Sequence, residues 1–122
     1  MAGTLITDTI EDGSGNSMAT STSIKGTAKA WVSFWGQTQY IRNSLNVSSV
    51  TRISAGQYRI TYTTAFPDVN YAFVGTSNDN GSGNGCLTIV LGIDPAWSQI
   101  YTINPQNLTQ NDASFVSAAV FK

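Results

Sequence analysis

The chain has 122 residues, which suits a single domain, because single domains usually contain about 100–150 residues. Hydrophobic residues make up 41% of it but charged residues only 11%, less than half of the quarter that is usual for a soluble domain. Six Lys and Arg against seven Asp and Glu give a formal net charge of −1, and the basic residues are scattered. This distribution argues against nucleic-acid binding and against polybasic attachment to a membrane.

Residue types that usually carry chemistry are scarce. The sequence contains no His, so it lacks the usual general base near neutral pH and the commonest zinc ligand. Cys86 is the only cysteine, which excludes an intrachain disulfide, and without a His to take its proton we expect it to be a small buried hydrophobe. The start of the chain has no signal-peptide pattern and no apolar run is long enough to span a membrane, which predicts synthesis in a cytoplasm.

The first 27 residues differ from the rest and predict an N-terminal arm. Residues 4–10 predict one strand without an obvious hairpin partner, and residues 11–23 form a polar, turn-rich link that we expect to be flexible. Such a strand can add to the sheet of another subunit, which makes Leu5, Ile6 and Ile10 candidate interface residues. The alternative is that this strand completes the sheet of its own domain.

The next segments carry the clearest strand patterns. Residues 28–34 alternate and place Trp31 on the less apolar side. In residues 57–63, Tyr58, Ile60 and Tyr62 share the core face and Arg59 lies on the other. Residues 45–53 are the predicted hairpin partner, with Gly56 in the connection and a bulge near residues 48–49.

Further strands are predicted at residues 70–75, 86–91, 99–103 and 114–121, with a mobile loop at 76–85 and a turn at 104–107. Helical periodicity is nearly absent. About seven or eight short strands predict an all-β fold, either an antiparallel β-sandwich or a jelly-roll-like barrel, with an N-terminal arm. We therefore expect residues 1–27 to form the arm and residues 28–122 a single β-sandwich domain.

No set of residues predicts a catalytic, cofactor or metal site. The acidic cluster of Asp8, Glu11 and Asp12 lies in the predicted arm, where burial is too slight to separate the pKa values of an acid and a base. The Gly/Asn-rich loops at residues 12–16 and 79–84 match neither an EF-hand nor a phosphate-binding loop. The remaining aspartates each stand beside typical turn residues: Asp68, Asp79, Asp94 and Asp112.

Aromatic residues are more informative than the charged ones. Trp31 and Trp35 bracket Phe34 at the end of a predicted strand. Tryptophan is enriched both in cores and at protein interfaces, so both residues are candidates for either place, with contact to glycan as a third alternative. We take Trp31 and Trp35 as candidate interface residues.

Four segments carry a resemblance to a known class of protein: KAWVSF at residues 29–34, IRNSLNVSSV at 41–50, GQYRI at 56–60 and TAFPDVNYA at 64–72. With the opening GTLITDTI, they resemble small β-rich virion proteins of tailed bacteriophages, of the head-decoration or cement, head-fibre and tail-fibre types. Ser33 and Trp35 stand where members of this class often have Asn, so the resemblance assigns no binding residues here.

The resemblance implies a non-enzymatic structural protein of the virion, made in the cytoplasm of the host. Since 122 residues are too few for a fibre with a shaft, the first expectation is an oligomeric decoration or head-fibre protein on the capsid exterior. Its expected partners are further copies of itself, as a trimer, and the major capsid protein. The alternative is a tail-fibre or adaptor module that binds a glycan or receptor on the host surface. A polysaccharide-degrading enzyme is a third possibility, which would need a carboxylate pair on the folded body.

Overall fold

The structure, a computed structural model, describes residues 2–78 and 86–122. In these residues it contains 11 strands and one short helix. The N-terminal elements are β1 (Thr9–Glu11), β2 (Ser17–Ala19) and α1 (Thr20–Gly26). The remaining strands are β3 (Ala28–Phe34), β4 (Ile41–Leu45), β5 (Val47–Ser54), β6 (Gln57–Tyr62), β7 (Ala72–Asn78), β8 (Leu87–Asp94), β9 (Trp97–Asn104), β10 (Thr109–Gln110) and β11 (Phe115–Phe121).

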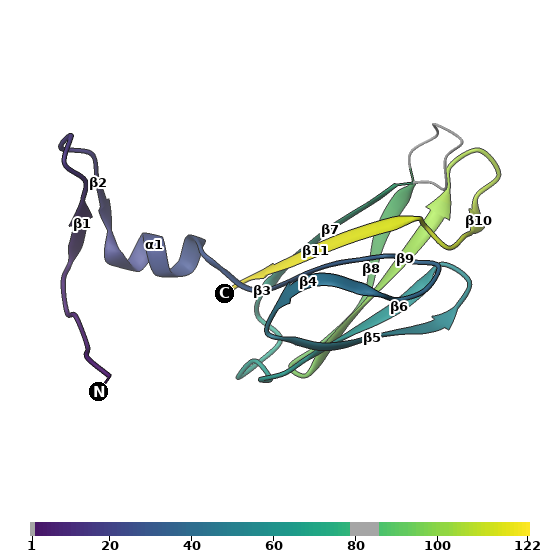
Figure 1. Ribbon diagram of the computed structural model, residues 1–122, viewed down its shortest axis with the longest axis horizontal. Coiled ribbons are helices and arrows are strands. Elements are labelled where there is room, and N and C mark those ends of the chain that lie inside the picture. The colour runs from purple at the N-terminus through teal and green to yellow at the C-terminus, as the bar shows by residue number, and fades with distance from the viewer. Residues whose placement is uncertain (1, 79–85) are drawn as a thin grey trace.

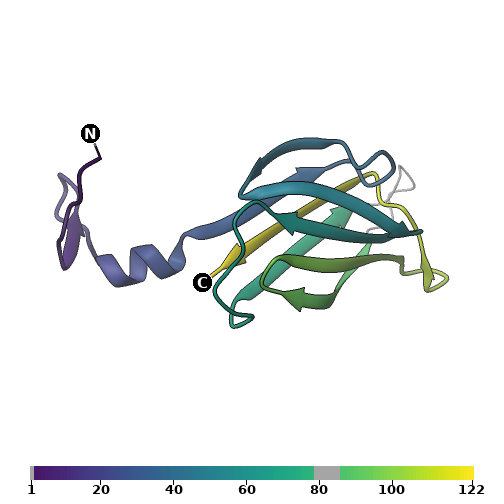
Figure 2. The same cartoon turned by 90° about the horizontal axis from the view of Figure 1, so that it is seen from below.

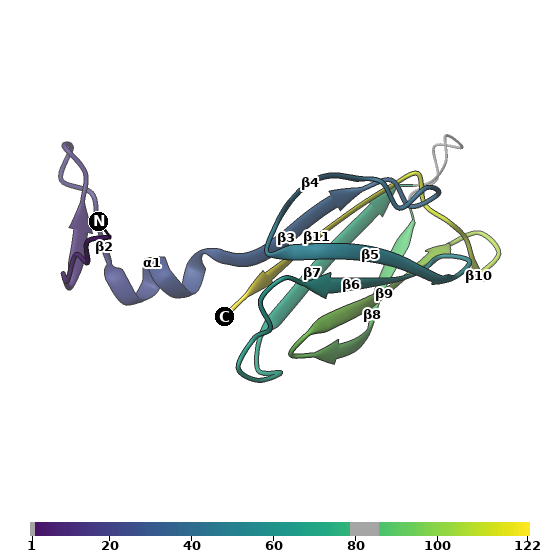
Figure 3. The same cartoon turned by 60° about the horizontal axis from the view of Figure 1, so that its bottom comes forward.

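Two antiparallel sheets pack face to face, which confirms the predicted β-sandwich (Figure 3). One sheet has the order β4-β3-β11-β7, and the other contains β5, β6, β9 and β8 in that order. The two-residue β10 pairs with the end of β9. The eight long strands of the two sheets agree with the seven or eight expected from the sequence.

The core is built by alternate residues of the central strands. The buried residues of β3 and β6 lie on the inner faces of the two sheets: Ala30, Val32 and Phe34 on β3, and Tyr58, Ile60 and Tyr62 on β6. The ring centroids of Phe34 and Tyr58 lie 5.3 Å apart in an edge-on contact. Buried and half-buried residues alternate along β6 and β11 and along most of β3 and β9, as one-sided burial of a strand requires. Cys86 packs against this core, as expected of a small hydrophobe, but it is half-buried and not fully buried.

The predicted hairpin is present, but its first strand begins later than expected. β5 pairs with β6 across the tight turn at Gly56, whose φ of +67° favours glycine. The predicted bulge appears between Val47 and Ser49. Leu45, however, ends β4 and pairs with Trp31 in the opposite sheet.

Asn46 explains this difference. Its φ is +53°, a conformation that Asn tolerates better than most residues, and its side chain exchanges two hydrogen bonds with the backbone of Thr64, at 2.7 and 3.1 Å. The chain therefore crosses from one sheet to the other at a single residue.

The later strands lie close to their predicted places. β7, β8, β9 and β11 overlap the four predicted segments, and residues 104–107 form the expected turn, closed by a hydrogen bond from the Leu108 N–H to the Asn104 carbonyl at 2.9 Å. Of the predicted mobile loop, residues 76–78 continue β7 as a strand. Residues 79–85 lie outside the described residues.

The N-terminal segment differs most from its prediction. The strand is shorter than expected and does have a hairpin partner, since β1 pairs with β2. The carboxylate of Asp12 closes the turn by accepting hydrogen bonds from the backbone N–H groups of Ser14 and Asn16, at 2.9 and 3.0 Å. The expected flexible link instead contains β2 and α1. Its local hydrogen bonds form without a hydrophobic pattern that the sequence would reveal.

This N-terminal segment projects away from the sandwich, as the two perpendicular views agree (Figures 1 and 2). None of the residues of α1 is buried, and every residue of the buried core lies between Ala30 and Val120. No helix in the described part of the chain is long and apolar enough to cross a membrane.

The register of β6 yields a stability prediction. Ile60 is 1% exposed, so Ile60→Ala should lower the free energy of unfolding by about 2–5 kcal/mol, the usual effect of emptying a packed aliphatic site. Arg59, on the opposite face, is half-buried, and Arg59→Ala should lower it by less than about 1 kcal/mol. Denaturant midpoints of both variants check this, and equal losses would contradict the assignment of the two faces.

Candidate functional site

The candidate interface residues from the sequence do not form one site. Leu5 and Ile6 precede β1 and are 86% and 90% exposed, and Ile10 lies in β1 with half of its surface exposed. Trp31 and Trp35 lie on or just beyond β3, and neither belongs to the buried core. The two groups are thus carried by different parts of the molecule.

The three tryptophans differ in what covers their rings. The Trp35 ring meets Phe115 edge-on at 5.9 Å, and the guanidinium carbon of Arg42 lies 5.4 Å from its centroid. The guanidinium carbon of Arg59 lies 4.5 Å from the centroid of Trp97. Within the described residues, no cation or aromatic ring stacks on Trp31. Trp31 is half-buried and Trp35 is the more exposed of the two at 42%, so the Trp31 ring is set apart by the lack of a stacked group and not by greater exposure.

Trp31 forms one wall of a groove of about 390 Å³ on the outer face of β3, β11 and β7. It pairs directly with Ala119 on β11, which in turn pairs with Val74 on β7. Trp31 and Val74 therefore stand two strand spacings apart, roughly 10 Å. The small side chain of Ala119 between them leaves the space that forms the groove.

A row of hydroxyl groups lies beside the tryptophan wall. Ser33 of β3 pairs with Ser117 of β11, which pairs with Thr76 of β7, and all three line the groove. The same alternation that buries Val32 and Ala118 turns these hydroxyls outward. The groove thus joins the aromatic ring of Trp31 to three groups that can each donate and accept hydrogen bonds.

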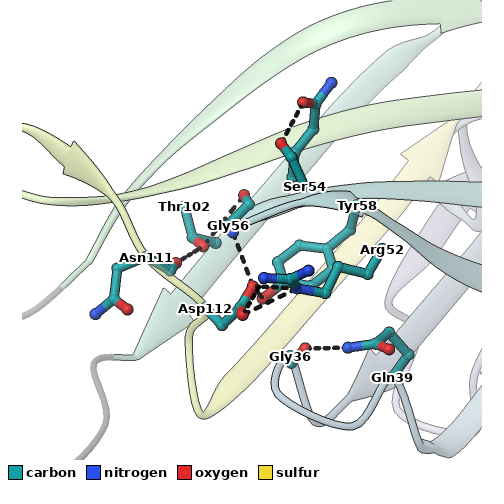
Figure 4. A network of polar contacts seen from close by, with 10 residues as sticks. Gly36, Gln39, Arg52, Ser54, Gly56, Tyr58, Thr102, Asn111 and Asp112 are labelled. Atoms are coloured by element: carbon teal, nitrogen blue, oxygen red, sulfur yellow. Dashed lines mark hydrogen bonds and ion pairs between the residues drawn. The ribbon is translucent and has the colours of Figure 1, made fainter.

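Asp112 is the most heavily bonded of the described carboxylates. It forms a salt bridge of 2.9 Å with Arg52 and accepts hydrogen bonds from the Gly56 N–H at 2.8 Å and the Tyr58 hydroxyl at 3.0 Å (Figure 4). Burial pushes the pKa of Asp112 upward, but the hydrogen bonds from Arg52, Gly56 and Tyr58 outweigh it and hold this pKa below its ordinary value. Asp112 therefore ties the segment before β11 to the β5–β6 hairpin.

Close packing surrounds this network. The hydroxyl of buried Thr102 donates to the Asn111 carbonyl at 2.5 Å. A Cβ atom at Gly56 would lie 2.5 Å from the Thr102 carbonyl oxygen, and one at Gly36 would lie 2.7 Å from the Tyr58 hydroxyl. Gly36 and Gly56 therefore leave no room for a larger side chain, and the hydrogen bonds of Asp112 serve to hold these segments together.

The other described aspartates of the body are also engaged. Asp68 pairs with Lys122, and this hydrogen bond lowers the pKa of Asp68. The carboxylate of Asp94 accepts a hydrogen bond of 2.8 Å from the Ala96 N–H. Asp79 lies outside the described residues. Within the described part of the chain, no group of three His, Cys, Asp or Glu side chains is placed to hold a metal ion.

Sequence patterns alone missed the groove. Alternation along β3 does place Trp31 and Ser33 on the outer face, but Thr76 and Ser117 come from strands far away in the sequence. Their approach depends on which strands become neighbours. One sequence feature that points to a groove is the run of small residues Ser117, Ala118 and Ala119 in an otherwise bulky strand.

Neither a family model nor the sequence of a curated protein matches this chain. Among solved structures, it is similar to the crystal structure of the phiAB6 tailspike in complex with three-repeated oligosaccharides of Acinetobacter baumannii surface polysaccharide. The TM-score is 0.62 at 16% sequence identity, and the match covers 93% of this chain but 22% of the tailspike chain. Since residues 1–27 make up more than a fifth of the sequence, the similarity of fold includes part of the N-terminal segment.

The Asp112 network predicts a pH-dependent loss of stability. Asp112→Asn should lower the free energy of unfolding at pH 7 by about 1–3 kcal/mol, because buried partners lose a charged acceptor. The pKa of Asp112 is lowered in the folded state, so its contribution is complete above the unfolded value of about 3.9 and is lost as pH falls through the folded value.

Urea unfolding of both proteins between pH 7 and pH 3 checks this prediction. The difference in the free energy of unfolding between wild type and Asp112→Asn should become smaller as the pH falls below about 4. Asp8→Asn in the exposed N-terminal segment serves as a control that should leave stability unchanged. If this difference in free energy stays constant across the pH range, the charge of Asp112 does not contribute to stability and the prediction is wrong.

Proposed function

We propose that this chain is a tail-associated virion protein of a bacteriophage and binds host-surface glycan in the Trp31 groove. The observation that carries the proposal is the groove itself, in which the half-buried indole ring of Trp31, without a stacked cation or ring in the described part of the chain, stands beside the hydroxyls of Ser33, Ser117 and Thr76. Sugars present a C–H face that packs on an aromatic ring and hydroxyls that exchange hydrogen bonds with polar side chains. The volume of about 390 Å³ falls within the usual range of small-ligand sites.

The tail location is favoured over the capsid by the structural comparison. The sequence favours a capsid decoration protein and keeps the tail module as its alternative. The similarity of nearly the whole chain to part of a tailspike, crystallised with surface-polysaccharide oligosaccharides, supports that alternative better. The chain corresponds to about a fifth of the tailspike's length, so in this proposal it is a module of a larger tail assembly.

In this proposal the protein binds glycan without cleaving it. Glycoside hydrolysis generally requires two carboxyl groups on either side of the scissile bond. The described aspartates of the body hold backbone or cationic groups of the fold, and none of them lines the Trp31 groove. Retention of the glycan, rather than its degradation, is the activity that this arrangement serves.

The N-terminal segment is proposed to be an arm, residues 1–27, that attaches the sandwich domain of residues 28–122 to its neighbours in the virion. Its hairpin has strands of three residues, and α1 has seven residues with none buried. Isolated hairpins and helices of this size are marginal in water. Contact of Leu5, Ile6 and Ile10 with another copy or another virion protein would stabilise them, and we include self-assembly, as a homotrimer, in the proposal.

Glycan binding is tested by calorimetry with oligosaccharide fragments of bacterial surface polysaccharides. For a fragment that binds the wild type, Trp31→Ala should weaken the affinity about tenfold or more, since a lost aromatic contact of about 1.4 kcal/mol corresponds to that factor. Thr76→Val, which removes one hydroxyl at nearly constant volume, should weaken it less but measurably.

Tyr40→Ala is the matched control, because Tyr40 is an exposed aromatic residue that does not line the groove. It should leave the affinity unchanged. Glycan binding that survives Trp31→Ala but is lost with Tyr40→Ala would move the site to another surface. Failure of a broad set of fragments to bind the wild type would contradict the proposed activity.

Removal of the arm should separate folding from attachment. A variant lacking residues 1–23 should keep the circular dichroism and cooperative melting of the sandwich, because the core begins at Ala30. It should no longer be incorporated into virions in a complementation assay. Unfolding or aggregation of the truncated protein would instead show that the arm belongs to the domain's own fold.

A further inference from the structure

The long edge strands of the sandwich differ in how they are protected. In the described part of the chain, β4, β5, β7 and β8 each pair with one neighbour. Edge strands of natural proteins commonly carry charges that prevent association with other strands. β4 and β5 carry the exposed residues Arg42 and Arg52, whereas β8 has no charged residue before Asp94 at its end.

β8 instead exposes an apolar surface. Five of its eight residues are large hydrophobic side chains, each between 38% and 49% exposed. We refer to these five as the open edge: Leu87, Ile89, Val90, Leu91 and Ile93. Leu87 and Ile89 pair with outward-facing residues of β9, whereas Val90 and Ile93 pair with inward-facing ones, so the strand exposes apolar side chains on both of its faces, as interaction sites commonly do.

Two residues of the open edge face the inside of the sandwich and are nevertheless exposed. Val90 pairs with Ile100 and Ile93 with Ser98, both of which are completely buried in the core. Residues paired across two strands lie on the same face of the sheet, so Val90 and Ile93 also point inward. Their exposed fractions of 38% and 41% show that the opposite sheet does not cover them.

The neighbouring edge strand leaves this gap open. β7 approaches β8 and is joined to it by a hydrogen bond of 2.7 Å between the Ser77 and Thr88 hydroxyls. Where β7 approaches Thr88, however, it carries Gly75, and a Cβ atom added there would already lie 3.4 Å from the Thr88 side chain, so β7 supplies no large side chain at this point. Val90 and Ile93 are therefore exposed at this edge, whereas Val47 and Val50 at the opposite edge are half-buried and pack against the core.

We propose that a second copy of this chain covers the open edge. This inference rests on the self-assembly included in the proposed function and names the surface that performs it. β8 itself carries no charge from Leu87 to Ile93, so two copies of this strand can meet without repulsion, and a partner recognised by its charge would find no complementary group on it. Homo-oligomers commonly join like surfaces in this way.

The contact is made by side chains rather than by a continuous sheet. β8 is bulged between Val90 and Gly92, which leaves Leu91 without a partner on β9. A bulge bends and twists an edge strand and interrupts the regular row of backbone groups that another strand would need. Leu91 therefore projects from the edge as a side chain that the second copy can bury.

The test measures mass in solution by light scattering for the wild type and for Leu91→Lys. Ile53→Lys is the matched control, because Ile53 lies on the edge strand β5 at the far side of the same sheet and is 46% exposed, against 45% for Leu91. We expect the wild type and Ile53→Lys to have a mass in solution that is a multiple of 13.0 kDa. Leu91→Lys should dissociate into monomers at a protein concentration at least tenfold higher than that at which the wild type dissociates. Assembly of the wild type should persist in high salt.

Circular dichroism establishes that each variant is folded. If Leu91→Lys is unfolded, the mass in solution is measured instead for Leu87→Lys, because Leu87 is the most exposed residue of the open edge. Folded variants that assemble like the wild type would overturn the assignment of the surface while leaving self-assembly intact. A wild-type mass of 13.0 kDa would overturn self-assembly as well, but not glycan binding in the groove, which calorimetry measures independently.

Discussion

A sandwich of two sheets has two sides at which its inner faces would meet water, and each side must be closed. On one side the chain does this itself, because Asn46 carries it directly from β4 into β5 and bonds to Thr64. On the other side β7 and β8 belong to different sheets and are joined by a hydrogen bond between the Ser77 and Thr88 hydroxyls. The interior there stays partly open, and this asymmetry is the physical reason to expect assembly with another molecule.

The inner and outer faces of the sheets have separate tasks. Inward residues such as Tyr58 and Ile60 form the core, and their position follows from alternation along a single strand, which the sequence displays directly. The groove depends instead on Ser33, Ser117 and Thr76 meeting across three strands. Which strands become neighbours is decided by the topology of the whole fold, so local patterns identify the outer face but not the site on it.

Elements stabilised by a few polar contacts were the hardest to predict. The turn after β1 depends on the Asp12 carboxylate, and the crossing after β4 depends on the positive φ of Asn46. Neither leaves a hydrophobic pattern, so the sequence suggested a flexible link and a longer hairpin. α1 has only one large apolar residue, Ile24, which is exposed, and periodicity cannot reveal such a helix.

The low charge of the chain connects these features, since an uncharged edge and a hydroxyl-lined groove both suit a subunit that works within an assembly. The most direct test of this account is electron microscopy of intact virions labelled with gold-conjugated antibodies against the chain. The account predicts gold at the tail. Label on the capsid exterior would instead favour a decoration protein, and particles without any label would contradict a place in the virion.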